Sequence, residues 1–391
     1  IVPHLEEGGM PKLVSTMSRA WQGAHSVTVV LLISGMERNY SVGGNVVELA
    51  PRGKGALGKA LAVARRIMRA KRFRRRERFD AVISFGSAAN AVNFLSRSGE
   101  RIILTEHNIK SQENRSWGIA GRFYDAMIRC LYNRADAVVA ISRAMKKDLE
   151  DHYGVRGVEL IHNPHDLAEI AEKGKEPLPE KFAFLESSRY IVAVGPTDER
   201  KGFWRLVRAF AEMRRRIPYL KLVIVGKEGP LHGEMISLCG RLSLGGDVVF
   251  AGFLPNPYPV MSRASLYACS SLREGLPNVI IESLALGVPV VSVDCVSGPR
   301  EILQNGDVPD GSAAADEMVD CGALVPAFPD GYGDDGEATR EELLFAKAVA
   351  DLLLDPERYE SAREAAIARR LDFSSNRIMA RYESLCMKEG N

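Results

Sequence analysis

The chain alternates between short apolar runs of strand length and longer stretches with helical periodicity. In the first half, the apolar runs predict strands at 27–33, 45–49, 80–85, 101–106, 136–142 and 158–162. Between these runs, helical patterns lie near 10–22, 56–76, 112–134 and 143–152. A second series begins with "YIVAVG" at 190–195 and continues through "KLVIVG", "DVVFAG", "SLYAC" and "VPVVSV". Strands that alternate with helices in this way indicate an α/β fold with parallel sheets.

A charged segment separates the two series. The stretch "EKGKEPLPEK" (172–181) combines charge, glycine and proline without an apolar run, which is typical of a linker. We therefore predict a first domain at 1–171, a linker at 172–188, a second domain at 189–372, and a final helical segment at 373–391 that packs back on the first domain. The opening residues "IVPHL" look like the end of a strand, which predicts that the natural first strand begins upstream. Doubly wound domains bind ligands outside the carboxyl ends of their strands, so we expect a ligand cleft between the two domains.

The stretch "SSLREGLPNVIIESLALGVPVVS" (270–292) places two acids in unusual surroundings. Pro277 suits the start of a helix and Gly287 its end, so a short helix is predicted at 277–286, buried on nearly every side. Glu282 lies inside this apolar helix, and Glu274 lies in the loop before it. A buried carboxylate requires hydrogen-bond donors, and the first turn of a helix favours an anion beside it. A polyhydroxylated, anionic ligand such as a sugar nucleotide would satisfy both features, whereas an arginine partner for Glu282 is the plainer alternative.

A pair of cations occupies a second turn of the same half. In "VGPTDERKGFWRLVRAFAEM", Arg200 and Lys201 follow a strand and directly precede a helix. Arginine offers two parallel donors and lysine a compact charge, so a pair at a strand-to-helix turn suits a diphosphate. A solvated surface pair is the alternative.

Composition narrows the class of protein. The 391 residues are 46% hydrophobic and 26% charged, which is ordinary for a globular chain of two or three domains. The formal net charge of +2 argues against bulk binding of nucleic acid. The six cysteines contain no C-x-x-C pair, so we expect reduced thiols in the cytoplasm and no disulfide framework. No apolar run reaches the roughly 18 residues of a membrane span, and no Asp-x-Asp follows a strand, so no metal site is predicted.

A basic stretch at 64–79 stands out from this balance. It reads "ARRIMRAKRFRRRERF" and carries nine Arg or Lys residues between 65 and 78. Such a run is either a solvated helix face or a surface that docks on an anionic membrane, with aromatic residues among the cations favouring the membrane. Nucleic acid is a third option, which the acidic remainder of the chain disfavours.

Together, these motifs resemble a known family. The residues from "VGPTDERKGFWRLVRAF" through "SSLREGLPNVIIESLALGVPVVS" to "DCVSGPREIL" look like the carboxyl-terminal half of the family-four retaining glycosyltransferases, which have the two-domain GT-B fold. The resemblance covers about 190–370 closely and extends to "PHLEEGGMPK" and "TEHN" in the front half. The two glutamates with seven residues between them are its most specific element. Pro196 departs from the pattern, because many relatives carry an arginine at that place.

The resemblance implies a role for each candidate residue. Glu274 would contact the transferred sugar, Glu282 the ribose, and Arg200 with Lys201 the leaving diphosphate. His107 would reach the sugar near the reacting centre. The turn near Phe253 and Leu254 would touch the nucleobase. The remaining donor contacts would come from the backbone of Gly9, Gly275, Leu276, Asn278 and Val279.

The fold expected from the resemblance is α/β, with two Rossmann-like doubly wound domains facing each other across a cleft. The expected function is the transfer of one sugar from a UDP- or GDP-sugar to a glycan or a polyprenyl- or lipid-linked acceptor, with retention and without a metal ion or cofactor. Bacterial cell-surface polysaccharide or glycolipid synthesis in the cytoplasm, with peripheral association at the cytosolic face of the membrane through 64–79, is the implied setting. A non-catalytic GT-B scaffold and a sugar-nucleotide epimerase remain the alternatives.

Overall fold

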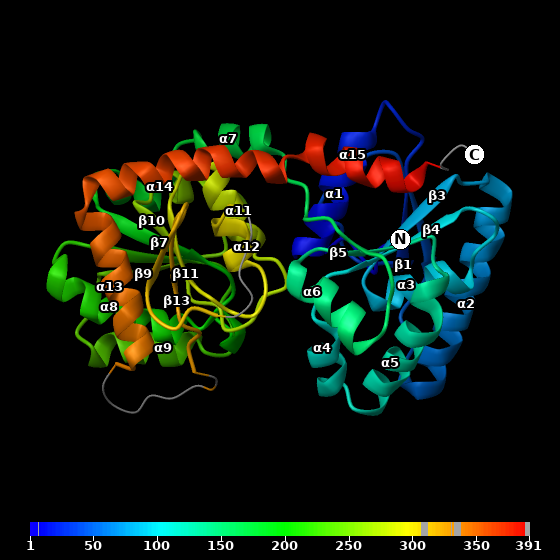
Figure 1. Ribbon diagram of the computed structural model, residues 1–391, viewed down its shortest axis with the longest axis horizontal. Helices are drawn as coiled ribbons and strands as arrows, with labels where there is room; N and C mark the ends of the chain where they lie inside the picture. Colours follow the sequence, from blue (N-terminus) through cyan, green and yellow to red (C-terminus); the bar gives the residue numbers. More distant parts are fainter. Residues whose placement is uncertain (7, 306–311, 330, 332–337, 388–391) are drawn as a thin grey trace. The chain divides into compact units, whose positions relative to one another are not determined.

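The computed structural model describes residues 1–6, 8–305, 312–329, 331 and 338–387. The chain forms two compact units, one of Ile1–His165 together with Phe373–Asn391 and one of Asp166–Asp372. Figure 1 shows both units in the colours of the sequence. Each unit is described below by itself.

The first unit contains a parallel sheet whose two parts are joined by the first residues of the chain. Its strands are β1 (Thr28–Ile33), β2 (Asn45–Ala50), β3 (Ala81–Phe85), β4 (Arg101–Glu106), β5 (Ala137–Ala140) and β6 (Val158–Leu160). β1 pairs with β2, and β3 to β6 pair in sequence order. Val2 N donates to Val30 O at 3.0 Å, and Phe85 N donates to Ile1 O at 3.0 Å, so residues 1–5 lie between β1 and β3. The strand order therefore reverses at residues 1–5, as in a doubly wound domain.

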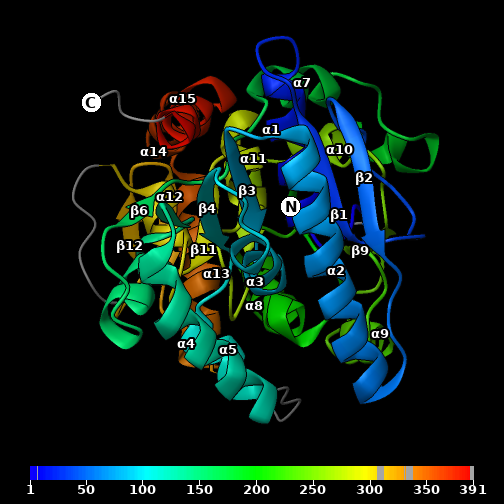
Figure 2. The same cartoon turned by 90° about the vertical axis from the view of Figure 1, so that its right-hand side faces the viewer.

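The helices of the first unit cover the two faces of this sheet. α2 (Gly55–Glu77), α3 (Ser87–Leu95) and α5 (Ile119–Leu131) lie side by side, with α3 in contact with both neighbours. α1 (Gly9–Trp21) packs against α15 (Ser375–Cys386), where Trp21 Nε1 donates to Glu383 Oε1 at 2.9 Å. The two groups of helices pack on separate hydrophobic clusters, one lined by α2 and α3 and the other by α1 and α15. Figure 2 shows α2 and the strands from the side. The last four residues of the predicted segment 373–391 lie outside the described residues.

The predicted strands of this unit are confirmed to within two residues at each end, whereas two predicted helical stretches are divided and one helix was not predicted. The helical stretch predicted near 112–134 consists of α4 (Lys110–Ser116) followed by α5, because Gly118 adopts a φ of +57° that interrupts the helix. The helix predicted at 143–152 begins as α6 (Arg143–Lys147) and continues as a π-helical turn over Asp148–His152. α3 was not predicted, because its nine residues include serine, alanine and two asparagines and show little periodicity.

The second unit has a seven-stranded sheet in the order β12-β13-β11-β10-β7-β8-β9. Its strands are β7 (Tyr190–Val194), β8 (Lys221–Val225), β9 (Val248–Gly252), β10 (Leu266–Cys269), β11 (Val290–Val293), β12 (Glu317–Val319) and β13 (Gly322–Val325). All neighbours are parallel except the edge pair β12 and β13. β7 comes first in sequence and lies beside β10, so this sheet reverses its strand order between β7 and β10.

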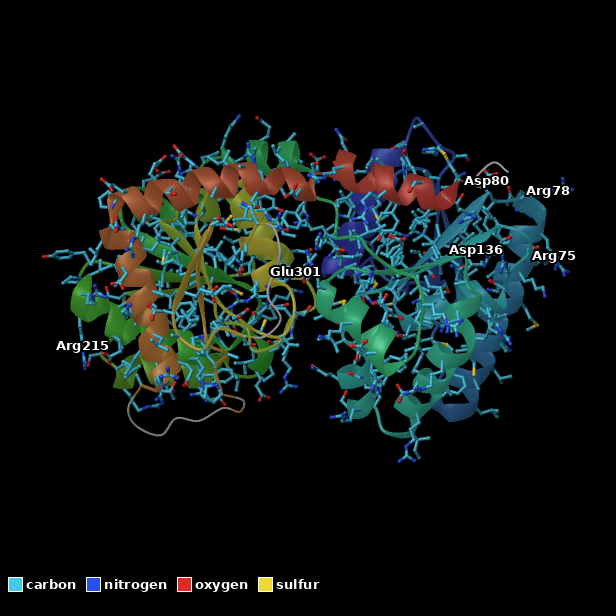
Figure 3. All side chains as sticks on the ribbon, in the orientation of Figure 1. Arg75, Arg78, Asp80, Asp136, Arg215 and Glu301 are labelled. Carbon is cyan, nitrogen blue, oxygen red and sulfur yellow. The ribbon has the colours of Figure 1, made fainter. Side chains whose placement is uncertain are left out.

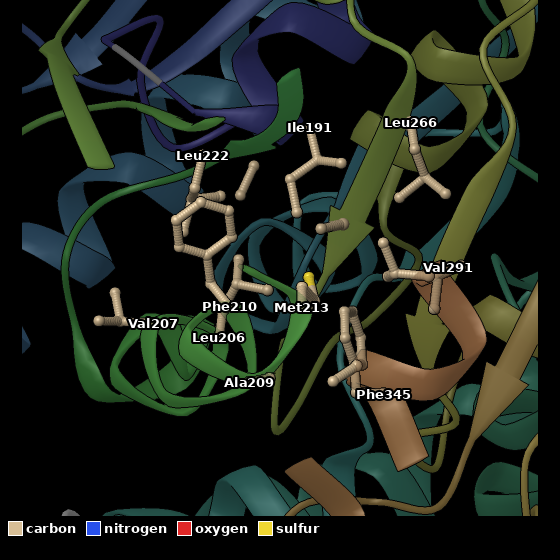
Figure 4. Packing of buried hydrophobic residues seen from close by; sticks show 14 of the residues in the cluster. Ile191, Leu206, Val207, Ala209, Phe210, Met213, Leu222, Leu266, Val291 and Phe345 are labelled. Atoms are coloured by element: carbon tan, nitrogen blue, oxygen red, sulfur yellow. The ribbon is translucent and has the colours of Figure 1, made fainter. Parts of the chain in front are cut away.

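The core of the second unit is the packing of two helices on this sheet. α8 (Phe203–Arg216) contributes Leu206, Val207, Ala209, Phe210 and Met213, and α13 (Arg340–Leu354) contributes Phe345 (Figure 4). These side chains meet Ile191, Leu222, Leu266 and Val291 from four neighbouring strands. The other helices are α7 (Leu167–Gly174), α9 (His232–Arg241), α10 (Tyr258–Ser262), α11 (Asn278–Ala285), α12 (Pro299–Leu303) and α14 (Pro356–Arg369). The residues predicted as a linker, 172–188, hold the end of α7 and a 3-10 helix at Glu180–Ser187.

Candidate functional site

The loops that follow β7 and β10 are fastened together at the point where the strand order of the second unit reverses. The chain leaves β7 at Gly195 and forms a 3-10 turn at Glu199–Lys201 before α8. Leu272 N donates to Arg200 O at 2.9 Å, and the Ser270 hydroxyl donates to Lys201 O at 2.8 Å. The carboxyl ends of strands at such a reversal are where doubly wound sheets bind ligands. Four residues predicted from the sequence, Arg200, Lys201, Glu274 and Glu282, belong to these loops and to the helix after them.

Lys201 and Glu274 form a close, buried ion pair. Lys201 Nζ lies 2.5 Å from Glu274 Oε1, and the two side chains are 10% and 7% exposed. Arg200 is half exposed, with one guanidinium nitrogen 3.7 Å from Glu274 Oε2. Burial by itself raises the pKa of the Glu274 carboxyl, but the charge and hydrogen bond of Lys201, with the charge of Arg200, outweigh burial and hold the pKa below its ordinary value. The carboxyl is therefore ionised at neutral pH. Arg200 also lies 3.8 Å from Asp198 Oδ2, so the two cations of this cluster meet two carboxylates, and Arg200 is its most exposed member.

The backbone fixes the position of the Lys201 ammonium. The aliphatic part of this side chain lies against Gly195, where an added Cβ would stand 2.6 Å from Lys201 Cε. Gly195 also has a φ of +152°, which L side chains rarely adopt. Asp198 caps the 3-10 turn by accepting from Lys201 N at 3.2 Å. The ammonium is thus held between a glycine, a capped turn and a buried carboxylate.

Glu282 lies on α11, the short helix that the sequence predicted at 277–286. The helix spans Asn278–Ala285 and begins after Pro277, and its residues from Ile280 onward are buried. Glu282 itself is only 6% exposed. Burial and the negative charges of Cys269, Glu274 and Glu282 raise the pKa of the Tyr267 hydroxyl well above its ordinary value. Both glutamates therefore lie near enough to Tyr267 of β10 to raise the pKa of its hydroxyl.

The remaining predicted donor residues surround the start of α11 and the end of β9. Gly275 and Leu276 precede Pro277, and the Ser297 hydroxyl donates to Gly275 O, which ties this loop to the segment after β11. Asn278 and Val279 form the first turn of α11 and are half-buried. Leu254 is half-buried two residues after β9, next to the exposed ring of Phe253. Lys227 Nζ lies 5.4 Å from the centroid of that ring.

Gly9 and His107 belong to the first unit. Gly9 is the first residue of α1, directly after the carboxyl end of residues 1–5. His107 follows β4, and its Nε2 lies 2.8 Å from the Thr105 hydroxyl oxygen. That hydroxyl donates its single hydrogen to Ser84 O at 2.8 Å, so His107 Nε2 must be the donor and Nδ1 the acceptor. Burial and the nearby charge of Lys110 lower the pKa of His107 to about 3, so the ring is neutral at pH 7.

Beside His107 lies a buried polar network that the sequence did not predict. Lys110 Nζ is 2.8 Å from Glu106 Oε2 and 2.6 Å from Glu113 Oε2. Glu106 also accepts from Asn90 Nδ2 at 2.9 Å and from the Tyr132 hydroxyl. The one signal of this network in the sequence is Glu106, the last residue of the strand predicted at 101–106. A charged residue at the end of a buried strand requires polar partners. Ser271, which donates a hydrogen bond to Glu274, was also missed, although it follows directly on a buried strand.

The basic stretch 64–79 corresponds to most of α2 and is not uniformly exposed. Arg74 is buried, pairs with Glu100, and donates to Asn93 O at 2.7 Å and to Ser96 Oγ at 2.8 Å. Arg66 and Arg69 donate to backbone carbonyls of the neighbouring segment 49–51. Treating the whole run as one solvated or membrane-facing surface is therefore wrong for Arg74, which helps to hold α2 against α3.

Two further features concern metals and membranes. Over the ranges that the structure describes, no group of three or more His, Cys, Asp or Glu side chains is placed to hold a metal ion. None of the helices formed by those residues has the length and hydropathy that crossing a bilayer requires.

Comparison with known proteins defines the class. Solved GT-B glycosyltransferases share the fold: HepE from Anabaena, in complex with UDP and glucose, has a TM-score of 0.71 at 18% identity and covers 98% of this chain and 97% of its own. Residues 7–169 match the family described as Glycosyltransferase Family 4, and residues 174–320 match Glycosyl transferases group 1. The chain therefore belongs to the group 1 glycosyltransferase family with the GT-B fold. The predicted family and fold class are confirmed.

Two curated relatives are named for steps of bacterial glycan synthesis. An N-acetylgalactosaminyltransferase of Campylobacter jejuni, named for an acceptor linked to diphospho-undecaprenol, is 35% identical over 45% of this chain and 46% of its own. The lipopolysaccharide core biosynthesis glycosyltransferase LpsE of Rhizobium meliloti is 34% identical over 45% of this chain and 49% of its own. The chain thus spans about half the length of the curated relatives that it matches.

Proposed function

We propose that this protein is a retaining glycosyltransferase that transfers one sugar from a nucleotide-sugar donor to a glycan or lipid-linked acceptor. The observation that carries the proposal is the cluster of Lys201, Arg200 and Glu274, which places a fixed ammonium and a half-exposed guanidinium at the strand-order reversal. A departing nucleoside diphosphate develops negative charge, and a fixed ammonium beside it stabilises that charge most in the transition state. The family to which the chain belongs supports the same reaction.

Each group of the site has a distinct role in this proposal. Lys201 and Arg200 neutralise the diphosphate, while Glu274 aligns Lys201 and accepts hydrogen bonds from hydroxyls of the transferred sugar. Glu282 accepts hydrogen bonds from the ribose, whose hydroxyls supply the donors that a buried carboxylate requires. The backbone of Gly275, Leu276, Asn278 and Val279 contributes N–H groups to sugar and phosphate, favoured by the first turn of α11.

The other donor contacts come from the end of β9 and from the first unit. Leu254 contacts the base, and the ring of Phe253 beside it offers an aromatic face. Gly9 allows close approach of backbone to the phosphates, and His107 Nδ1 accepts a hydrogen bond from a sugar hydroxyl. These side chains and helix ends stabilise the leaving group in place of a divalent ion.

Retention follows from a mechanism in which the departing phosphate oxygen takes the acceptor proton on the face of the sugar that it leaves. The bond from the anomeric carbon to the phosphate oxygen breaks, the bond to the acceptor oxygen forms, and the proton passes to the phosphate. No second carboxylate is needed as a base, unlike in retaining glycosidases, so the protein acts by positioning and charge stabilisation.

The donor is a UDP- or GDP-sugar, and the acceptor is a glycan or a polyprenyl-linked glycan in bacterial cell-surface polysaccharide or glycolipid synthesis. The names of the Campylobacter and Rhizobium relatives support this class of acceptor, and the UDP complex of HepE supports this class of donor. We further propose a cytoplasmic enzyme that associates with the cytosolic face of an anionic membrane through the exposed cations of 64–79.

Isothermal titration with UDP- and GDP-sugars, followed by mass spectrometry of products from a panel of acceptors, tests the function. We expect one nucleotide sugar to bind and to be consumed only when an acceptor is present. If no nucleotide sugar binds to the folded protein, a non-catalytic scaffold replaces the transferase.

A further inference from the structure

Two helices of the first unit, α2 and α5, carry exposed apolar side chains on either side of α3. α3 contacts both α2 and α5, so the three lie side by side over one face of the sheet (Figures 1 and 2). Each helix follows a parallel strand, so α2, α3 and the α4–α5 segment all begin beyond the carboxyl ends of β2, β3 and β4. The starts of the three helical segments therefore share one end of this layer.

On α2, one stripe of exposed side chains changes character along the helix. Leu57, Leu61 and Met68 are exposed at the spacing of successive turns, and Leu57 is 75% exposed. The same stripe continues to Arg72 and Arg75, which are exposed near the end of the helix. Figure 3 shows Arg75 and Arg78 at that end, close to Asp80. The apolar part of the stripe thus lies at the start of α2 and the cationic part at its end.

The turn between α4 and α5 carries larger exposed apolar groups. Ile119 is 87% exposed, Phe123 is 69% exposed, and Trp117 is also exposed. Trp117 and Phe123 contact the ring of Tyr124, with centroids 5.5 Å and 6.0 Å away. Between this turn and α2, the first turn of α3 exposes only Ala88. Isolated exposed apolar side chains are ordinary, but a group over neighbouring helices marks an interaction surface. We call Leu57, Leu61, Met68, Trp117, Ile119 and Phe123 the apolar patch.

The charges around the apolar patch have one sign. The segments 51–76, 87–95 and 114–124 contain no aspartate or glutamate. Exposed cations accompany the patch on the same elements, among them Lys54, Lys59, Arg65, Arg115 and Arg122. A second copy of this chain would bring the same cations against each other, which disfavours a symmetric dimer. An anionic lipid surface accepts both the apolar groups and the cations, and tryptophan and tyrosine are enriched at membrane interfaces.

We infer that the apolar patch is the surface that docks on an anionic membrane, with Leu57, Ile119 and Phe123 entering the boundary between headgroups and acyl chains. The lysines and arginines around it meet the lipid phosphates. The cationic end of α2 contributes long-range attraction only, because Arg74 is buried against Glu100 and Arg76 lies 2.8 Å from Glu77. The inference deepens the proposed function and rests on it only in placing a lipid-linked acceptor near this surface.

Sedimentation with vesicles tests the inference on the full chain. Wild-type protein is mixed with phosphatidylcholine vesicles and with vesicles containing phosphatidylglycerol, at low salt and at physiological salt. The test variant replaces three exposed apolar residues, Leu57→Ser, Ile119→Ser and Phe123→Ser. The matched control replaces two exposed apolar residues of the second unit, Tyr219→Ser and Ile236→Ser. A third variant carries Arg72→Ser and Arg75→Ser.

We expect the wild type to pellet with anionic vesicles and to retain part of that binding at physiological salt, because buried apolar surface is not screened. The triple variant should lose roughly a hundredfold in partitioning, and the control should equal the wild type. The variant with Arg72→Ser and Arg75→Ser should lose vesicle binding mainly at low salt, where charge attraction is least screened. Its loss should be smaller than that of the triple variant. Unchanged pelleting of the triple variant would overturn the inference.

Two further measurements separate the other outcomes. Light scattering that shows a wild-type dimer, a monomeric triple variant and no vesicle binding would overturn the inference in favour of a second copy of the chain. Titration of a nucleoside diphosphate into the same proteins reports on the donor site and not on the apolar patch. Loss of nucleotide binding by every protein would contradict the proposed function, whereas the vesicle result stands or fails independently.

Discussion

Each unit buries a lysine beside a glutamate at the carboxyl end of a strand, yet the two arrangements differ in every surrounding group. In the first unit, Lys110 lies between Glu106 and Glu113, and Asn90 and Tyr132 saturate Glu106. In the second unit, Glu274 lies between Lys201 and Arg200. In the first cluster one lysine therefore meets two carboxyl groups, whereas in the second one buried carboxyl group meets two cations.

The pKa directions follow the same contrast. Burial alone lowers the pKa of Lys110, but Glu106 and Glu113 outweigh it and raise the pKa above its ordinary value. For Glu274, the two cations outweigh burial and lower the pKa. Lys110 and Glu274 are thus both charged at neutral pH. Only the cluster around Lys201 and Glu274 includes a half-exposed cation that can meet an anionic ligand. A buried ion pair by itself does not identify a ligand-binding site. The charge and the exposure of the third residue, Glu113 in the first unit and Arg200 in the second, distinguish the two clusters.

The largest expected effect is on catalysis, from Lys201→Ala. Losing a fixed donor to the departing diphosphate should lower kcat by about 10²–10³-fold, with a smaller rise in KM, because the interaction strengthens as charge develops. Steady-state kinetics with the identified donor measures the division between the two constants. Lys221→Ala, which removes a partly exposed lysine near Asp247 in the same unit, is the matched control. A change confined to KM would show that Lys201 only binds the donor.

The corresponding substitution in the first unit is Lys110→Met. It should lower the stability of the protein and leave the chemistry of the second unit unchanged. Removing the lysine leaves the buried Glu106 carboxyl without its cationic partner, which should lower the free energy of unfolding by about 3–5 kcal/mol. Urea denaturation measures this change, and titration with a nucleoside diphosphate should show unchanged affinity. Reduced nucleotide affinity without loss of stability would reverse the roles assigned to the two pairs.

A smaller effect is expected from Glu282→Ala. The ribose hydroxyls lose a charged acceptor, which should weaken nucleoside diphosphate binding by about 1.5–3 kcal/mol, or roughly ten- to hundredfold. Glu282→Gln keeps a hydrogen-bond acceptor, so its affinity for the nucleoside diphosphate should lie between those of Glu282→Ala and the wild type. Isothermal titration gives the affinities. Equal affinity for wild type and both variants would exclude Glu282 from ribose binding.

The pH dependence of stability sharpens the description of the first unit. The folded-state pKa of His107 is about 3 and its unfolded-state pKa is about 6.5, so only the unfolded chain takes up this proton between those values. Stability from this group is therefore complete above about pH 6.5 and decreases as the pH falls. Between pH 7 and pH 5, wild type should lose about 2 kcal/mol more than His107→Gln in urea denaturation. Parallel losses in the two proteins would mean that His107 protonates normally.

The smallest expected effect is that of a chelator, which should leave the wild-type rate unchanged. Lys201, Arg200 and the start of α11 supply the positive charge that a divalent ion provides in other transferases. Activity before and after treatment with EDTA, with magnesium and manganese added back, measures this. A rate that disappears with EDTA and returns with either ion would refute the metal-independent mechanism.

Much of the second unit could be predicted from local patterns. Pro277 and Gly287 bounded α11 to within one residue, because proline and glycine restrict the backbone directly. The turn at Gly118 and the helix α3 were missed, since a positive φ and a weakly periodic nine-residue helix leave little trace in an apolar pattern. Strand positions were the most reliable, as buried parallel strands read as continuous apolar runs.

The candidate site was predictable as a set of residues but not as a geometry. The sequence singled out Lys201 and Glu274 separately, whereas their 2.5 Å contact joins residues 73 positions apart. The same limit concealed Glu106 and Lys110, because Asn90 and Tyr132 reach Glu106 from other helices. Arg74 shows the same limit for a surface prediction. It belongs to a basic run, yet it is buried, because Glu100 and polar atoms of α3 lie opposite it.

The glycine under Lys201 has a consequence for interpreting natural variants. Exchanging glycine for alanine adds one methyl group and would ordinarily be scored as mild at a loop position. At Gly195 that methyl group would stand 2.6 Å from Lys201 Cε and push the ammonium away from Glu274. A single methyl group there would displace the cationic group of the site although no charged residue had been replaced. Alleles at position 195 should therefore be grouped with those of Lys201 when their phenotypes are compared.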